Sequence, residues 1–188
     1  MREPIGGATA HPGPEAAAPR GDRWTGPLLL AATVAMGLMA GLFFAFDVSV
    51  MPGLDRLPDR RYAEAMQRFN EAIDGNGLFA LVFLGALAAT AAAAVLAHRA
   101  GRRPTARWAA AAAVLYLAVL VLTFAVNIPL NNELAALGDP AKAADLSVVA
   151  DFRGRWEAVN IGRTLLCTAA LGGLAHALRL HARAPRPR

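Results

Sequence analysis

The chain has 188 residues, of which 56% are hydrophobic. Its mean hydropathy is +0.38, and its net charge of +5 goes with an isoelectric point of about 10.6. A soluble domain of this length is ordinarily less apolar and spreads its charges more evenly. The composition therefore argues against a soluble globular protein. The charges are confined to separate blocks, which makes nucleic acid a poor candidate partner despite the basic total.

Four apolar runs predict membrane-spanning helices. The expected spans lie at about residues 28–50, 77–97, 108–128 and 160–180. About 20 apolar residues are needed to cross the hydrocarbon core, and backbone polar groups in lipid must be satisfied within the segment. We predict an all-α integral membrane four-helix bundle over residues 27–180, with the first span retained rather than cleaved as a signal peptide. Residues 1–26, rich in Pro, Gly and Ala, and residues 181–188 are expected to be a disordered tail and a basic tail.

The charge of the connecting segments predicts the orientation. The loop between spans two and three and the C-terminal segment carry arginines and no acid: Arg99, Arg102, Arg103, Arg107, Arg179, Arg183, Arg186 and Arg188. The two longer loops have mixed charge with a slight excess of acids. The positive-inside rule then places both termini and the middle loop in the cytoplasm of a multi-pass protein of the cell membrane. The lipid bilayer is the expected partner.

Each longer loop is expected to contain a short amphipathic helix. In the first, apolar residues recur at helical spacing between Asp59, the expected cap, and Gly75, and this helix lies either on the membrane surface or over the bundle. In the second, Asp139 before Pro140 resembles a helix start. The apolar side of that helix would consist of Leu146, Val149, Phe152 and Trp156.

Polar residues gather at the outer end of the third span, in "VNIPLNNEL". Pro129 lacks an N–H and disfavours an α conformation at the preceding residue, so it predicts a break or kink. A break frees backbone carbonyls near Ala125, and we expect Asn127 or Asn131 to satisfy them.

A second polar group lies at the outer end of the fourth span. Asn160, Arg163 and Thr164 are spaced i, i+3, i+4 and share a helix face, with Trp156 one turn earlier. Asp47 lies at the outer end of the first span. An arginine in the membrane boundary either snorkels to the interface or faces a partner or water inside the bundle. In the functional interpretation, the amides and Arg163 line an outward-facing pocket with donors for a carbonyl, phenolate or carboxylate.

The sequence offers little for metal or cofactor chemistry. No CxxC, HExxH, GxSxG or P-loop motif is present, and the single cysteine, Cys167, is interpreted as a packing residue. A haem between His98 and His176 is the alternative, but basic interfacial positions explain these histidines more simply. We therefore predict no metal and no cofactor. A GxxxG at Gly37 and Gly41 is compatible with a homo-oligomer, although packing within one bundle is the simpler interpretation.

Four segments carry a family resemblance: "GLFFAFDVSVMPGL", "YAEAMQRFNEAI", "NIPLNNEL" and "RWEAVNIGRTLL". In this order they match the anthrone-oxygenase-like family of small bacterial and fungal membrane proteins, over roughly residues 28–178. The resemblance implies four membrane helices and, as in fungal members, cofactor-free oxygenation of an anthrone to an anthraquinone. The family's characteristic residues correspond to Pro52, Asn127, Pro129, Leu130, Asn131, Trp156, Asn160, Arg163 and Thr164. Many members have histidine where this chain has Ile161.

Two main functional hypotheses follow. The first is an oxygenase for a lipophilic phenolic substrate, with Asn127, Asn131, Asn160 and Arg163 as catalytic residues and Trp156, Thr164, Asp47 and Pro129 as substrate-binding residues. The second is a non-catalytic membrane module that binds a lipophilic ligand or a partner protein, which Ile161 in place of the family histidine favours. A small transporter is the weakest hypothesis, because no acid lies in mid-span to couple protons.

Overall fold

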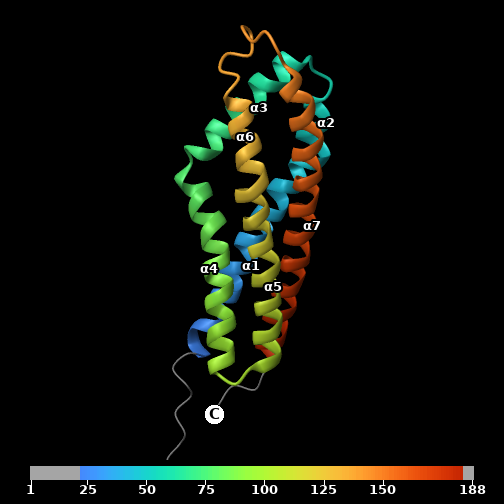
Figure 1. The fold of residues 1–188 in the computed structure, drawn as a ribbon. Helices are drawn as coiled ribbons and strands as arrows, with labels where there is room; N and C mark the ends of the chain where they lie inside the picture. Colours follow the sequence, from blue (N-terminus) through green and yellow to red (C-terminus); the bar gives the residue numbers. More distant parts are fainter. Residues whose placement is uncertain (1–21, 184–188) are drawn as a thin grey trace, which may run out of the picture.

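The computed structural model describes residues 22–183, so the tail predictions for residues 1–21 and 184–188 lie outside the described chain. Within it, four helical segments are long and apolar enough to cross a membrane: Arg23–Leu54, Gly77–Arg99, Arg103–Ala135 and Ser147–Arg183. They lie side by side in an elongated bundle (Figure 1). The prediction of an all-α four-helix membrane bundle is confirmed. Residues 22–26 and 181–183, expected in the tails, are helical.

The described chain consists of two halves that begin with the same order of elements and then differ, because the second half has no separate helix corresponding to α3. The first half contains α1 (Asp22–Ala45), the π-helical turn η1 (Phe46–Val50), α2 (Met51–Leu54), α3 (Asp59–Asp74) and α4 (Gly77–Arg99). The second contains α5 (Arg103–Leu122), the π-helical turn η2 (Thr123–Asn127), α6 (Ile128–Ala135) and α7 (Ser147–Arg183). In each half a long helix passes through a π turn into a short helix that begins with a proline-bearing turn.

Of the break or kink predicted at Pro129, the break is wrong, and the kink stays a prediction. The helix continues through η2 into α6, and Ile128, just before the proline, keeps α-helical angles of φ −63° and ψ −48°. The N–H of Ile128 donates to the carbonyl of Thr123, five residues earlier. This wider turn relieves the clash between a proline ring and the carbonyl four residues before it, so the helix need not break. Pro52 follows η1 in the same way, where Met51 N–H donates to Phe46 O.

The four long segments form a ring in which α1 and α5 each pack against both α4 and α7. Two clusters of buried apolar side chains fill the bundle. The larger lies along its axis and includes Met36, Met39, Phe43, Phe83, Tyr116, Val119 and Leu174. The smaller lies at the end that holds α2, α3 and α6 and includes Met51, Tyr62, Met66, Leu134, Phe152 and Trp156. We call this the loop end, and the opposite end, with the α4–α5 turn, the arginine end (Figure 1).

The helix α3 covers the loop end of the bundle. Tyr62, Ala63 and Met66 are buried there. Of the two predicted positions, the membrane surface or over the bundle, α3 therefore takes the second. Burial, and secondarily the charge of Glu157, raises the pKa of the Tyr62 hydroxyl, so the phenol stays neutral in this contact. Asp59 is the first helical residue rather than the cap, which is Pro58, and its carboxylate lies 3.2 Å from Arg153 of α7.

The second loop differs from its prediction. No helix begins at Asp139; residues 139–146 form turns, and the helix starts at Ser147 and runs without interruption into the fourth span. The apolar side expected of a separate helix is instead the first part of α7, with Val149, Phe152 and Trp156 buried. Burial against α3 outweighs the local start signal, as tertiary packing commonly does.

Side chains of α3 tie it to this loop. Arg60 Nη1 donates to the carbonyls of Pro140 (2.6 Å) and Ala141 (2.9 Å). Gln67 Nε2 donates to the carbonyls of Leu134 (2.9 Å) and Gly138 (3.1 Å). These bonds satisfy backbone acceptors in the last turn of α6 and in the loop that follows it, and they hold α3 over the bundle. The C-terminal part of α3 is therefore held in place, where it forms one wall of a cavity.

Candidate functional site

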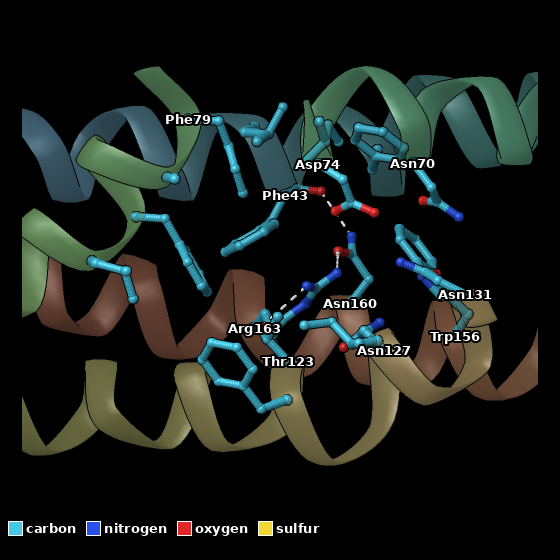
Figure 2. Close-up of a pocket in the computed structure, with 18 residues that line it drawn as sticks. Phe43, Asn70, Asp74, Phe79, Thr123, Asn127, Asn131, Trp156, Asn160 and Arg163 are labelled. Atoms are coloured by element: carbon cyan, nitrogen blue, oxygen red, sulfur yellow. Dashed lines mark hydrogen bonds between the residues drawn. The ribbon is translucent and has the colours of Figure 1, made fainter. Parts of the chain in front are cut away.

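A cavity of about 240 Å³ lies between the two apolar clusters, just beneath α3. Its walls come from α1, η1, α3, the start of α4, η2, α6 and α7 (Figure 2). Six aromatic side chains line it: Phe43, Phe46, Phe79, Phe83, Phe124 and Trp156. Phe79 and Phe83 stack with ring centroids 5.4 Å apart, and Phe46 lies 5.6 Å from Trp156. The cavity is mostly apolar, with a few polar groups directed into it.

Arg163 is the most unusual of these polar groups, because its side chain is only 5% exposed in an apolar bundle. Its guanidinium lies over the ring of Phe43, 4.4 Å from the centroid, and 5.4 Å from that of Trp156. It donates to Asn160 Oδ1 at 2.6 Å and to Thr123 Oγ1 at 3.3 Å. Ring faces and neutral oxygens thus hold the cation without a direct ion pair in the described chain.

Asn160 connects Arg163 to a carboxylate. Its side-chain nitrogen donates to the carbonyl of Phe43 (2.9 Å) and to Asp47 Oδ1 (2.5 Å), and Thr164 Oγ1 donates to the other oxygen of Asp47 (2.5 Å). The amide dipole of Asn160 therefore has its positive end on Asp47 and its negative end on Arg163. This arrangement stabilises both charges while keeping them apart.

The amide of Asn127 has no partner. The residue is 2% exposed, and neither its nitrogen nor its oxygen forms a hydrogen bond with any described group. Arg163 Nε is likewise buried without a partner. Buried polar groups in proteins are normally satisfied, so an unpaired amide and an unpaired guanidinium N–H in one cavity require an explanation. A ligand with an oxygen acceptor would satisfy the donors.

Asn131 does not satisfy a freed carbonyl either. Its Oδ1 accepts a hydrogen bond from Trp156 Nε1 at 3.0 Å, which fixes the indole against the cavity. Because η2 continues the helix, the expectation that Asn127 or Asn131 caps carbonyls near Ala125 is wrong. Both amides are instead directed inward from the wall formed by η2 and α6 (Figure 2).

The predicted site residues divide into two groups. Asn127, Asn131, Trp156, Asn160 and Arg163 all line the cavity. Asp47 and Thr164 lie outside the lining, where Asp47 accepts hydrogen bonds from both Asn160 and Thr164. Pro129 also lies outside the lining and is exposed. Of the four residues predicted to bind substrate, only Trp156 therefore lines the cavity.

Sequence reasoning missed Asn70 and Asp74 of α3, which also line the cavity. Asp74 points into it in Figure 2, and no hydrogen bond or ion pair holds its carboxylate within residues 22–183. Besides Arg163, it is the only charged side chain in the lining. The available signal was spacing, since Asn70 and Asp74 are four residues apart on one helix face, as Asn127 and Asn131 are.

The cavity borders both an apolar and a polar surface. Leu84 and Phe124, which line it, are 51% and 54% exposed on the flank of the bundle between α4 and η2. At the loop end, Asn70, Asp74 and Asn131 also line an adjoining groove with Gln67, Glu71 and Asn132. One side of the cavity therefore faces the apolar belt of the bundle and the other faces polar side chains under α3.

Ile161, at the position of the family histidine, is 50% exposed and does not line the cavity. It directly follows Asn160, so on a helix it is rotated about 100° away from the inward face. A histidine here would point out of the bundle. In residues 22–183, no group of three or more His, Cys, Asp or Glu side chains is placed to hold a metal ion.

Replacement of Asn160 should strongly destabilise the protein. In Asn160→Ala, Phe43 O loses a partner, and Asp47 and the buried Arg163 lose the amide between them. We expect a loss of about 3 kcal/mol in the free energy of unfolding, measured by denaturant titration in mild detergent. Ile161→Ala, the adjacent outward-facing change, is the control and should cost under about 1 kcal/mol. Equal losses in both variants would contradict the assigned network.

Comparison with protein families gives one match. The family model described as anthrone oxygenase matches residues 79–173, just over half of the chain. The match includes the inward-facing residues of η2, α6 and α7, but neither Asp47 nor α3, so it is narrower than the resemblance seen in the sequence motifs. No curated protein and no solved structure matches the chain. From this match and its four apolar helices, we conclude that the chain is a membrane protein of the anthrone oxygenase family.

Proposed function

We propose that the cavity catalyses cofactor-free oxidation, by dioxygen, of a lipophilic phenolic substrate of the anthrone type. One observation carries the proposal: the Asn127 amide and Arg163 Nε are buried, unpaired and in the lining of a single aromatic cavity. Donors fixed in a water-poor site stabilise an oxyanion much better than donors in water, because they need no reorganisation when charge develops. Membership of the family supports the same reaction class.

The cavity suits a flat aromatic ligand. An apolar cavity of about 150 Å³ accommodates benzene, so about 240 Å³ leaves room for a larger ring system. The rings of Phe43, Phe79 and Trp156 line the cavity, and aromatic contacts with them would favour a flat aromatic ligand. The exposed side chains of Leu84 and Phe124 give a route from the apolar belt, so a membrane-dissolved substrate can enter without crossing water.

Asp74 is the proposed general base. Its carboxylate removes a proton from the methylene carbon of the anthrone, and the electron pair moves onto the carbonyl oxygen, which becomes a phenolate. Arg163 and Asn127 hold that oxygen. The electron-rich carbon then reduces dioxygen and bonds to it, and protonated Asp74 returns its proton to the resulting peroxide.

The second half of the reaction uses the same base. Asp74 removes the remaining hydrogen on that carbon as a proton, the O–O bond breaks, and the carbon–oxygen bond becomes a carbonyl. The departing hydroxide takes the proton from Asp74 and leaves as water. In total one methylene and one dioxygen give one ketone and one water, with no further oxidant or reductant. The polar groove beside Asp74 provides an exit for the water.

The variant Asn127→Leu distinguishes a catalytic role of the Asn127 amide from a structural role. Leucine has nearly the same shape and removes two buried unpaired atoms, so the free energy of unfolding should stay within about 1 kcal/mol or increase. Loss of an oxyanion donor should slow anthrone oxidation about a hundredfold, measured as oxygen uptake above the rate in buffer. Asn132→Leu, exposed on the same helix, should keep full activity. Destabilisation by several kcal/mol with activity retained would contradict the proposal.

Asp74→Asn tests the base. We expect kcat to fall about a hundredfold, while binding of an anthraquinone product, followed by quenching of tryptophan fluorescence, stays unchanged. Glu71→Gln removes the same charge from the adjoining groove and should retain activity. If the unmodified protein binds anthrones but oxidises them no faster than buffer does, the cavity belongs to a ligand-binding module, which was the second hypothesis.

We also propose that the protein lies in the cell membrane with its arginine end in the cytoplasm. The four arginines between Arg99 and Arg107, with no acid among them, carry this orientation. The cavity then opens toward the outer side. A reporter enzyme that works only in the cytoplasm should be active when it is fused after Arg103, and one that works only in the periplasm should be inactive there. Activity of the periplasmic reporter at this position would reverse the assigned orientation.

A further inference from the structure

A groove at the arginine end lies between the last turns of α4 and the first turns of α5. Its charged members are Arg99 of α4 and Arg103 and Arg107 of α5, with His98 beside them. Its apolar members are Ala94 and Val95 of α4 and Ala106 and Ala110 of α5. Ala94, Val95 and Ala110 lie nearer the middle of the bundle than the charged members of their helices, and Ala106 lies beside Arg107. We call this the arginine groove. It is far from the cavity in the fold, because the cavity is lined by the opposite end of α4 and by η2 and α6, which follow the far end of α5.

The turn between α4 and α5 brings the arginines together. Gly101 adopts φ +73°, a left-handed conformation that glycine tolerates well. The N–H of Arg102 donates to Ala97 O and that of Gly101 to His98 O, a bond pattern that ends α4 sharply. The chain reverses within three residues, so Arg99 and Arg103 lie on opposite sides of one short turn. Arg107 follows Arg103 by one helical turn on the same face.

Within residues 22–183, the three guanidinium groups have no counter-charge. Among the described residues, no ion pair or hydrogen bond holds the side chains of Arg99, Arg103 or Arg107. The sequence has no Asp or Glu between Gly75 and Asn132, which includes both helices of this hairpin. Three like charges in one groove repel each other, and an anion placed among them relieves that repulsion. Arginine is well suited to phosphate because its planar N–H groups bind two oxygens at once.

The apolar members indicate which phosphate compound fits. A free phosphate needs only the arginines, whereas this groove continues over small side chains toward the middle of the bundle. Val95 is 50% exposed, and the alanines beside it leave room along the flank. A headgroup at the end of a span and an acyl chain running toward its middle have this same arrangement in a bilayer.

We propose that the arginine groove binds an anionic phospholipid, with the phosphate among Arg99, Arg103 and Arg107 and an acyl chain along the alanine-lined part. The site is independent of the proposed oxidation, since it uses none of the cavity residues. The bound lipid neutralises the uncompensated charge at the α4–α5 turn and so stabilises the hairpin whose other end forms the cavity wall.

The test measures lipid binding by native mass spectrometry of the full-length protein released from detergent. Phosphatidylglycerol should be retained and phosphatidylcholine should not. Each basic side chain near an anionic headgroup contributes about a factor of five, so the triple variant R99Q/R103Q/R107Q should lose about a hundredfold in phosphatidylglycerol affinity. R56Q/R61Q/R68Q removes the same charge from the loop end and should bind as the unmodified protein does.

Two further arms separate the lipid from its phosphate. Ala110→Phe fills the apolar part without changing charge and should weaken lipid binding, whereas Ala111→Phe, outside the groove, should not. Inorganic phosphate at millimolar concentration should fail to displace the lipid. The proposal is overturned if the triple variant keeps its affinity, if phosphatidylcholine binds equally, if Ala110→Phe has no effect, or if phosphate alone competes fully.

Discussion

The burial of Arg163 without a direct carboxylate partner is the constraint on which the rest of the loop end depends. Taking a guanidinium out of water costs several kcal/mol, and here that cost is offset by several weak contacts rather than by one ion pair. Phe43 and Trp156 present ring faces, Asn160 and Thr123 present oxygens, and Asp47 acts through Asn160. These contacts come from α1, η1, η2 and α7, so the cation fixes the register of those elements. A shift of one element by a single turn would strand a charge in an apolar core.

The two π turns make this arrangement available. A π turn inserts one extra residue into a helix, which reorients the side chains around it and frequently occurs at functional sites. In the first half, η1 directs Asp47 toward Asn160; in the second half, η2 directs Thr123 and Asn127 toward Arg163 and the cavity. Each turn is followed by a proline, whose ring is accommodated by the wider backbone. The π turns of the two halves therefore supply different chemistry from different positions, a carboxylate from the second residue of η1 and an amide from the last residue of η2.

Hydropathy and charge predict the four spans because burial in lipid leaves only apolar helices as solutions. Helical spacing also predicts the shared face of Asn160, Arg163 and Thr164, since rotation per residue is fixed. The same geometry predicts that Ile161 lies on the other side of the helix. The family motif drew attention to the histidine expected at this position rather than to its outward direction. The π turns were not predictable from propensity, because Pro129 indicates a break unless a compensating bulge exists. Asp74 was missed because its place in the cavity depends on how α3 folds over the bundle, which is a matter of long-range packing.

The two charged residues that line the cavity, Arg163 and Asp74, are held in different ways. Arg163 belongs to a long helix and is held by a network inside the bundle, whereas Asp74 is the last residue of a covering helix held by Arg60 and Gln67. An oxyanion site needs rigid donors, and a base that works twice on one carbon needs access to both substrate and water. Here Arg163 and Asn127 would meet the first requirement and Asp74 the second. In the proposed reaction, a lipophilic substrate enters past the apolar side chains of the belt and meets the donors that lie beside η2 and α7. The carboxylate of Asp74 lies at the polar side, where the proposed reaction exchanges protons and water.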